Sequence, residues 1–350
     1  MRAVVYSGYG ATPVLTEVPE PACPADGVVI TVGATGVCRS DWHAWKGHDP
    51  VVLPHIGGHE FAGLVAAAGS EVTRWRPGDR VTVPFACGCG RCAFCLAGDA
   101  QVCPDQTQPG FTGPGSFAEL VVVHAADANL VALPGDVSFV TAACLGCRFA
   151  TAFRAVTAHG RVDPGDWLAV HGCGGVGLSA VMIGAALGAR VVAVDVSAAA
   201  LERARELGAE AVVEAGTAGV TAGAGVAGAV AEITGGGAHV SVDALGSPAL
   251  AADSVRCLRR RGRHVQVGLL PGGPVALPMD LVIARELELY GSHGMAARDY
   301  PAMMAMVAGG TLRPSLLVGS TITLEEVGAA LAAMDGPSTT AGLTVASLAG

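Results

Sequence analysis

The sequence has 350 residues, of which 51% are hydrophobic, 15% are charged and 5% are aromatic. This length allows two domains of ordinary size, and the hydrophobic fraction, with a net charge of only −9, excludes a disordered chain. The acidic balance also argues against nucleic acid as the main partner, because phosphate contacts need a basic face.

The first 146 residues predict a mostly-β domain of short strands and turns. Runs rich in β-branched residues and bounded by Gly, Pro or Asp predict strands at Ala3–Tyr6, Val28–Val32, Arg80–Val83 and Phe117–Val123. Pro-rich and Gly-rich connections separate these runs, as is typical of turns.

From Asp166 onward, short apolar runs alternate with longer Ala-rich stretches. Strands are predicted at Trp167–His171, Arg190–Val194, Val240–Ala244 and His264–Gly268, with helices at Val176–Leu187 and from about Ala198 to Leu207. This alternation predicts a parallel sheet with right-handed crossovers. The tail after Tyr290 holds one predicted helix, about Arg298–Ala308, and either forms a small third unit or rejoins the first domain.

Two features of the second half have alternative interpretations. The stretch Trp167–Ala189 is uncharged and long enough to cross a bilayer, but the glycines clustered between Gly172 and Gly177 indicate a turn instead. Five arginines lie between Arg256 and Arg263. We expect them at a helix C-terminus, where cations stabilise the helix dipole, rather than at a phosphate or nucleic-acid site.

Four cysteines in one Gly-rich loop, Cys89-x2-Cys92-x2-Cys95-x7-Cys103, predict a structural zinc site. Four thiolates at this spacing can close a tetrahedral shell and leave no position for substrate. Cys87 is a spare thiol beside the loop or an alternative ligand. Because no signal peptide is visible, the eleven cysteines favour metal binding or catalysis in a reducing, cytoplasmic location over a disulfide framework.

A second constellation combines Cys38-Arg39-Ser40-Asp41-Trp42-His43 with Gly58-His59-Glu60. It offers one thiolate, one imidazole and a carboxylate able to orient the imidazole. A third ligand has to come from elsewhere, and Cys147 is the candidate. Zinc held by three protein ligands keeps a fourth position for substrate, which catalysis needs.

A third motif is the run Gly172-Cys173-Gly174-Gly175-Val176-Gly177. It follows a predicted strand and opens a predicted helix, and Asp195 ends the next strand. Glycines in this context let the backbone approach a pyrophosphate at a helix N-terminus, while Asp195 is placed to accept hydrogen bonds from the adenosine ribose. Because this carboxylate repels a 2′-phosphate and no Lys or Arg follows it closely, the motif favours NAD over NADP.

These three motifs, in this order, resemble the zinc-dependent medium-chain alcohol dehydrogenases from Cys38 to the tail. The resemblance implies an α/β protein with a mostly-β GroES-like catalytic domain (residues 1–148), a doubly wound Rossmann domain that binds NAD (149–289) and a C-terminal return to the catalytic domain (290–350). It implies that catalytic zinc is bound by Cys38, His59 and Cys147, the ligand set for which alcohol dehydrogenase is the standard example.

The resemblance also assigns roles to neighbouring residues. Asp41 orients His59, Glu60 lies behind the metal and approaches it transiently, and Ser40 and His43 relay the alcohol proton to solvent. The expected cofactor contacts are Arg39 on the pyrophosphate, Thr151 and Val176 on the nicotinamide, the Gly172–Gly177 turn, Asp195 and Val267. Phe85 matches an aromatic residue of the substrate pocket, and Trp42, Trp45, Phe111 and His293 line the pocket or serve as packing.

The expected reaction is hydride transfer from a primary or secondary alcohol to NAD, with two zinc ions per chain. Arg148, beside the third ligand, either contacts substrate or cofactor or is a surface residue. The short segment between Cys103 and Cys147 favours a homotetramer over a dimer. The alternatives are a polyol or sugar dehydrogenase of the same superfamily, against which Cys147 and the complete four-cysteine loop count, and a non-catalytic zinc-ribbon interaction protein.

Overall fold

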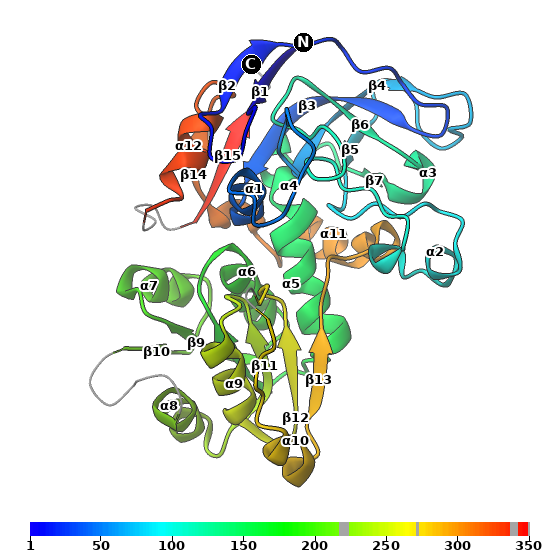
Figure 1. Ribbon diagram of the computed structural model, residues 1–350. Helices are drawn as coiled ribbons and strands as arrows, with labels where there is room; N and C mark the ends of the chain where they lie inside the picture. The colour runs from blue at the N-terminus through cyan, green and yellow to red at the C-terminus, as the bar shows by residue number, and fades with distance from the viewer. Residues whose placement is uncertain (217–223, 271–272, 337–341, 349–350) are drawn as a thin grey trace. The chain divides into compact units, whose positions relative to one another are not determined.

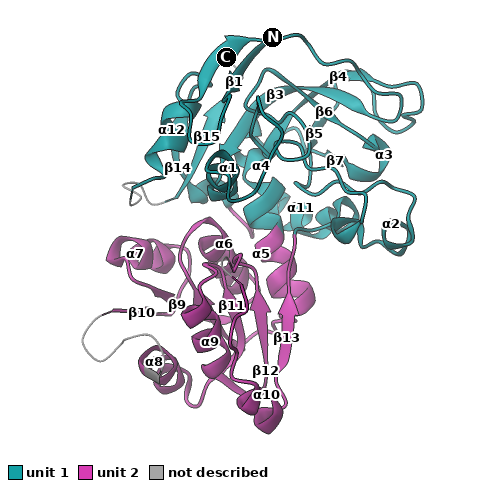
Figure 2. Ribbon diagram, viewed as in Figure 1, with its two compact units in different colours: residues 1–150, 294–310, 314–350 teal, residues 151–293, 311–313 magenta. Residues whose placement is uncertain are grey.

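The computed structural model describes residues 1–350 except 217–223, 271–272, 337–341 and 349–350. The chain divides into two compact units, coloured separately in Figure 2. Unit 1 comprises residues 1–150, 294–310 and 314–350, and unit 2 comprises residues 151–293 and 311–313. The end of the chain therefore belongs to the same unit as the beginning.

Unit 1 is mostly β, as its sequence predicts, and its main sheet has the order β14-β15-β3-β4-β5-β7, with β6 also paired to β3. Neighbouring strands of this sheet are antiparallel except for β14 and β15. The strands are β1 (Arg2–Val5), β2 (Val14–Glu17), β3 (Val28–Val37), β4 (Glu60–Ala68), β5 (Arg80–Thr82), β6 (Leu120–Val123), β7 (Val131–Ala132), β14 (Val318–Ile322) and β15 (Leu343–Ser347). β1 and β2 form a separate antiparallel pair.

The helices of unit 1, labelled in Figure 1, are short and occur along the chain in the connections between strands. They are α1 (Arg39–Trp45), α2 (Ala93–Ala97), α3 (Ala126–Asn129), α4 (Phe139–Ala143), α11 (Tyr300–Ala308) and α12 (Val327–Ala333), with the 3-10 turns η1 (Ala100–Val102), η4 (Ala297–Asp299) and η5 (Pro314–Leu317). The π-helical turn η2 (Leu145–Phe149) follows α4. Such turns disturb a regular helix and often occur at functional sites.

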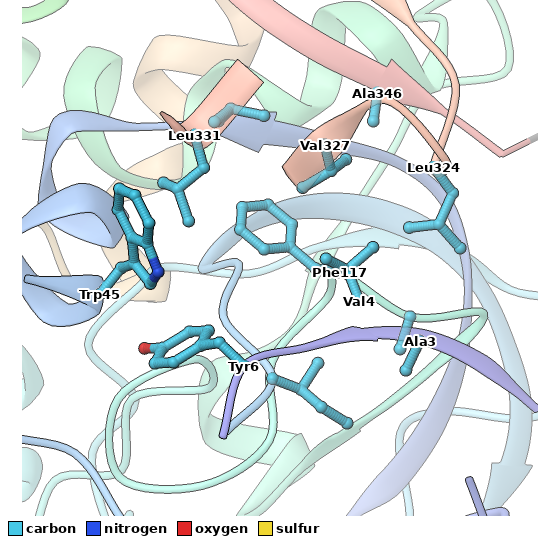
Figure 3. Close-up of a cluster of buried hydrophobic side chains, with 12 residues drawn as sticks. Ala3, Val4, Tyr6, Trp45, Phe117, Leu324, Val327, Leu331 and Ala346 are labelled. Carbon is cyan, nitrogen blue, oxygen red and sulfur yellow. The ribbon is translucent and has the colours of Figure 1, made fainter. Parts of the chain in front are cut away.

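One hydrophobic cluster joins the two ends of the chain within unit 1 (Figure 3). Trp45 at the end of α1 packs in the same cluster as Phe117 and as Leu331 of α12. Trp45 is 4% exposed and its indole nitrogen donates to Ala11 O at 2.7 Å, so of the two roles expected for it, packing is correct. This packing anchors α1, the helix that begins directly after Cys38.

Unit 2 contains a parallel sheet with the order β10-β9-β8-β11-β12-β13. Its strands are β8 (Trp167–His171), β9 (Arg190–Asp195), β10 (Ala211–Glu214), β11 (Ala238–Asp243), β12 (Leu258–Gln266) and β13 (Glu288–Gly291). The helices are α5 (Ala150–Arg154), η3 (Ala155–His159), α6 (Gly175–Ala186), α7 (Ala198–Glu206), α8 (Ala224–Thr234), α9 (Pro248–Arg256) and α10 (Met279–Arg285). This is the doubly wound Rossmann order, in which ligands bind where the strand order reverses, here at the carboxyl end of β8.

The structure resolves both ambiguous features of the second half. The stretch Trp167–Ala189 consists of β8, a turn and α6, and among the described residues no helix is long and apolar enough to span a membrane. The expectation for the arginine cluster is wrong, because only Arg256 ends a helix and the others lie on β12. Two of these arginines donate hydrogen bonds from the strand. Arg260 donates to Ala284 O at 3.0 Å, and Arg261 donates to the Glu286 carboxylate at 2.9 Å.

Candidate active site

The four-cysteine loop folds into a compact sulfur cluster in unit 1. The thiols of Cys89, Cys92, Cys95 and Cys103 all lie within 4.8 Å of one another. Backbone N–H groups point at the sulfurs: Cys92 N donates to Cys89 Sγ, Cys95 N to Cys92 Sγ and Cys89 N to Cys103 Sγ, each at 3.4 Å. These donors stabilise thiolates, and the hydrogen bonds from the loop backbone lower the pKa of Cys89 to about 6.

The geometry of this cluster fits a zinc ion. Tetrahedral zinc–sulfur bonds of about 2.3 Å place the sulfur atoms about 3.8 Å apart. The Cys89 and Cys95 sulfurs are 4.0 Å apart, and those of Cys92 and Cys103 are 3.6 Å apart. Cys87 lies outside the cluster and donates to Pro84 O at 3.4 Å, and burial raises the pKa of its thiol to about 12.

Asn129, which sequence reasoning did not single out, holds the start of this loop. Its side-chain oxygen accepts from Gly88 N at 2.9 Å and its side-chain nitrogen donates to Gly88 O at 2.8 Å. Asn129 is buried at the end of α3. No sequence spacing links it to the cysteines, so only the fold identifies it.

The second cluster of unit 1 brings together Cys38, His59 and Cys147 from three distant parts of the chain. Cys38 follows β3, His59 precedes β4, and Cys147 lies in the π-helical turn η2. Their ligand atoms all lie within 4.8 Å of one another. His59 is 1% exposed and its Nε2 has no hydrogen-bond partner, which is the expected condition of an imidazole that binds a metal.

Asp41 connects two of these three segments. Its Oδ1 accepts from His59 Nδ1 at 2.9 Å and from Gly58 N at 3.0 Å, while its Oδ2 accepts from Cys38 N at 2.9 Å. The carboxylate is 2% exposed. It therefore fixes the His59 ring with Nε2 free, and it also holds the backbone that carries Cys38.

The electrostatics of the cluster favour metal ligands. The hydrogen bond from the Cys147 thiol lowers the pKa of Cys38 well below its ordinary value. Burial opposes a charge on His59, but Asp41 raises the pKa of its imidazole well above the ordinary value. The hydrogen bond to Cys38, together with burial, raises the pKa of the Cys147 thiol well above its ordinary value, so Cys38 holds the thiolate of this pair. Zinc would bind the three groups in their deprotonated forms, as thiolates and a neutral imidazole.

Glu60 and Arg148 form a buried ion pair beside the cluster. Glu60 Oε1 accepts from Arg148 N at 2.9 Å and from Arg148 Nε at 3.0 Å, and Arg148 Nη2 donates to Oε2. Glu60 is fully buried and Arg148 is 8% exposed, so the expectation that Arg148 is a surface residue is wrong. Although burial opposes its charge, the Glu60 carboxylate raises the pKa of Arg148. Burial also raises the pKa of Glu60, and the Arg148 guanidinium opposes that rise.

The remaining candidates of unit 1 surround these clusters. Ser40 Oγ lies 3.8 Å from Cys38 Sγ. His43, on α1, is half-buried, and its Nδ1 is 3.0 Å from Nδ1 of the exposed His48, which sequence reasoning did not assign. Arg39 donates to Met334 O at 2.6 Å.

Two aromatic rings contact the imidazole of the cluster. The ring of Phe85 lies edge-on to His59 with centroids 6.2 Å apart, and the ring of Phe111 lies at 5.0 Å. Gly146 O accepts from Phe85 N at 3.0 Å, which ties Phe85 to the turn that carries Cys147. The buried Tyr300 hydroxyl donates to the same turn, to Leu145 O at 3.1 Å. The cluster therefore has an apolar wall as well as polar ligands.

In unit 2, the glycine-rich motif forms the turn between β8 and α6. Gly172 has φ +89°, in the region that favours glycine. A Cβ on Gly177 would lie 1.7 Å from Gly172 O, whereas a Cβ on Gly174 would meet no atom within 4 Å. Gly174 is exposed and is the N-cap of α6, so no side chain of the cap residue covers this helix N-terminus, where a phosphate can bind.

Asp195 ends β9 next to this turn. Its Oδ2 accepts from Cys173 N at 2.6 Å and its Oδ1 from Ser197 N at 2.9 Å. Thr151 is buried on α5, and Val267 follows β12, where its N–H donates to Asp243 O at 3.0 Å. The geometry of the turn and of Asp195 thus fits a dinucleotide.

Comparisons with known proteins agree with this architecture. Residues 24–135 match the family described as "Alcohol dehydrogenase GroES-like domain", and residues 175–309 match "Zinc-binding dehydrogenase". The chain is 33% identical over 316 residues to an alcohol dehydrogenase of Geobacillus stearothermophilus, covering 89% of this chain and 90% of the relative. It is 30% identical to a sorbitol dehydrogenase of Halalkalibacterium halodurans, covering 93% and 94%. A solved NAD-dependent alcohol dehydrogenase superposes with a TM-score of 0.89 at 30% identity, covering 99% of this chain and all of that one.

Proposed function

Because the chain belongs to the zinc-dependent medium-chain alcohol dehydrogenases, we propose that it interconverts a primary or secondary alcohol and its aldehyde or ketone by hydride transfer to NAD. The observation that carries the proposal is the cluster of the buried Cys38 and His59 with the partly exposed Cys147, in which His59 Nε2 has no hydrogen-bond partner. Three protein ligands leave a zinc ion one position for a substrate oxygen.

The residues of unit 1 have distinct roles in this proposal. Cys38, His59 and Cys147 hold the catalytic zinc, and Asp41 holds His59 in the required orientation. When bound, zinc supplies a Lewis acid for the alcohol oxygen, and NAD supplies the acceptor of the hydride. Ser40 takes the hydroxyl proton, which leaves toward solvent by way of His43.

Unit 2 binds NAD in this proposal. The amides of Gly174, Gly175 and Val176 at the start of α6 would bind the pyrophosphate, and Asp195 would accept hydrogen bonds from the ribose hydroxyls. Gly172, whose own amide donates to Val194 O at 2.8 Å, and Gly177 allow the tight turn that brings the backbone close to the cofactor. Arg39 contacts the pyrophosphate, Thr151 and Val176 pack on the nicotinamide, and Val267 contributes a further cofactor contact. The carboxylate of Asp195 repels a 2′-phosphate, which supports NAD over NADP.

The proposal also covers the zinc content of the protein, its number of subunits and its location in the cell. The four-cysteine loop holds a second, structural zinc ion, giving two per chain. The protein is a cytoplasmic homo-oligomer, a tetramer rather than a dimer, with a small alcohol or aldehyde as substrate. Six of the eleven cysteines lie in the two clusters that we assign to zinc, and a reducing location would keep their thiols available to the metal. Metal analysis and light scattering of the purified protein test the zinc content and the number of subunits.

A polyol or sugar dehydrogenase is the second candidate, favoured by the sorbitol dehydrogenase relative. Against it stand Cys147 as the third ligand and the complete four-cysteine loop. A non-catalytic zinc-ribbon interaction protein does not agree with family membership, because the dehydrogenase match extends along most of the chain.

Formation of NADH at 340 nm over a panel of primary, secondary and polyhydroxy alcohols tests the function. We expect kcat/KM to be highest for a monohydroxy alcohol and higher with NAD than with NADP. A preference for polyols would establish the second candidate instead. A preference for NADP would contradict the role of Asp195, and replacing Asp195 by Ser should narrow the difference between the two cofactors if that role is correct.

A further inference from the structure

Glu60 and Arg148 each follow a proposed metal ligand directly. Glu60 comes after His59, and Arg148 comes after Cys147, 88 positions along the chain from its partner. The guanidinium and the backbone amide of Arg148 together engage both oxygens of the Glu60 carboxylate. The ion pair therefore links the segment that carries one ligand to the segment that carries another.

The space for this pair is created in the sheet itself. Gly36 on β3 is the cross-strand partner of Glu60 on β4. A Cβ on Gly36 would lie 2.6 Å from Glu60 Oε2 and 3.0 Å from Arg148 Nη2. Because Gly36 has no side chain, the carboxylate and the guanidinium can turn toward each other there.

Two carboxylates thus connect all three ligand segments. Asp41 joins Cys38 to His59, and Glu60 joins the His59 segment to the turn that carries Cys147. The two carboxylates differ in one respect. Asp41 contacts the metal site through the ring and backbone of its ligands, whereas Glu60 is held by a cation.

A buried carboxylate next to a zinc site has two ways to satisfy its charge. It can pair with a cation, or it can bind the metal, because Asp and Glu oxygens are ordinary zinc ligands. Here the carboxylate is paired with a cation, because Arg148 contacts both oxygens of Glu60. Removing the guanidinium would leave a fully buried carboxylate that has to bind the metal ion or take up a proton, because an unpaired buried charge is too costly to keep. The coordination of the metal distinguishes these two outcomes.

From this geometry we propose that Arg148 is a positioning residue that keeps Glu60 out of the coordination shell of the catalytic metal and leaves the fourth position to substrate. It also holds the turn of Cys147 against the segment of His59. The inference rests on the proposed function of the three-ligand cluster as a catalytic metal site. The alternative is an ion pair that serves stability alone.

Cobalt substitution separates these two roles, because the visible absorption of Co²⁺ reports its coordination. We compare the wild-type protein, with cobalt exchanged into the three-ligand site and zinc kept in the four-cysteine loop, with Arg148→Met and with the double variant Glu60→Gln, Arg148→Met prepared in the same way. Met keeps the length of the side chain without its charge, and Gln keeps the shape of Glu60 without its negative charge. Arg190→Met, which breaks an exposed ion pair with Glu210 in unit 2, is the matched control.

We expect the wild type and the control to show the intense absorption of tetrahedral cobalt. Arg148→Met should lose intensity as Glu60 becomes an additional ligand, and its kcat should fall about tenfold or more, the usual cost of changing a residue that supports a metal ligand. The double variant should regain the tetrahedral spectrum and most of the activity. The inference is wrong if Arg148→Met keeps the wild-type spectrum, or if the double variant is no closer to wild type than the single one.

A second variant covers the case in which Arg148→Met does not fold. Arg148→Lys keeps the charge, but a single ammonium group lacks the fork that engages both oxygens. It should give the same spectral change to a smaller extent, and the change should disappear in the double variant Glu60→Gln, Arg148→Lys. A change that persists in this double variant would overturn the inference, because Glu60 could not be its cause. Because the spectrum does not depend on the substrate, a protein that shows these changes without oxidising alcohols would contradict the proposed function and leave this inference intact.

Discussion

The two cysteine clusters of unit 1 differ in how the chain brings their sulfur atoms together. The four-cysteine cluster comes from one loop, residues 89–103, and is stabilised by backbone amides of that same loop. The three-ligand cluster takes its members from positions 38, 59 and 147, and buried carboxylates hold them. The first cluster has four ligands, three of them partly exposed, whereas the second has three ligands, two of them buried.

This difference has a physical reason. A closed shell of four thiolates needs only local geometry, and a loop of fifteen residues can supply it. A metal ion with three protein ligands has a fourth coordination position that nearby donor groups could occupy. Its ligands therefore need a rigid frame of strands and fixed side chains that keeps those groups away. We therefore expect damage to the local cluster to affect stability, and damage to the nonlocal cluster to affect turnover.

The largest effect on turnover is expected from Cys38→Ala or Cys147→Ala. Each change removes one of three ligands, so about one zinc per chain should be lost and activity should be abolished. Metal analysis and NADH formation measure both results. Cys144→Ala, at a buried cysteine outside both clusters, is the control. Activity that survives the loss of Cys38 would disprove the proposed metal chemistry.

Asp41→Asn should have the next largest effect. An amide cannot accept hydrogen bonds from the Cys38 and Gly58 amides and from His59 as the carboxylate does. We expect zinc affinity to fall about 10- to 100-fold at the catalytic site, with the structural zinc retained. Competition with a chelator measures the affinity. An equal loss of both zinc ions would mean that Asp41 acts on the whole unit rather than on its ligands.

Cys95→Ser should have the opposite effect to the two preceding changes, lowering stability and leaving turnover nearly unchanged. The variant should lose the structural zinc and melt at least about 5 °C lower, as expected for a loss of roughly 2 kcal/mol in a domain of this size. At temperatures below unfolding, kcat should stay within a few-fold of wild type. Calorimetry and kinetics on the same sample measure the two results. A complete loss of activity without unfolding would contradict a purely structural site.

The smallest effect is expected at the exposed edge of the catalytic site. Burial lowers the pKa of His43, and the neighbouring His48 lowers it further, with Arg39 acting in the same direction and Cys38 and Asp49 opposing. His43 accepts a proton only when neutral, so activity falls as the pH drops through this pKa. The variant His48→Gln should raise the pKa of His43 and move the acidic limb of kcat/KM to higher pH. His124→Gln, at an exposed histidine paired with Asp26, should leave the limb in place.

The sequence predicted the parts of the molecule that depend on local pattern. The alternating strands and helices of unit 2 are confirmed, because a parallel sheet covered by helices leaves a regular hydrophobic period. The bounds of single strands are less accurate in both units: β6 begins at Leu120 and not at Phe117, and β12 begins at Leu258 and not at His264. The arginine cluster was placed in the wrong element because a run of charge indicates exposure and says nothing of helix or strand.

By itself, the sequence determined the chemistry of this protein: thiolates at zinc spacing, a glycine turn between a strand and a helix, and an acidic residue after the next strand. These signals are local, so few residues specify them. Only the tertiary structure decided what holds the catalytic cluster together. The partner of Glu60 is 88 positions away at Arg148, and the position that makes room for both is Gly36 on the neighbouring strand. A buried charge is satisfied by whatever the fold brings within hydrogen-bond distance, and distance along the chain does not record that.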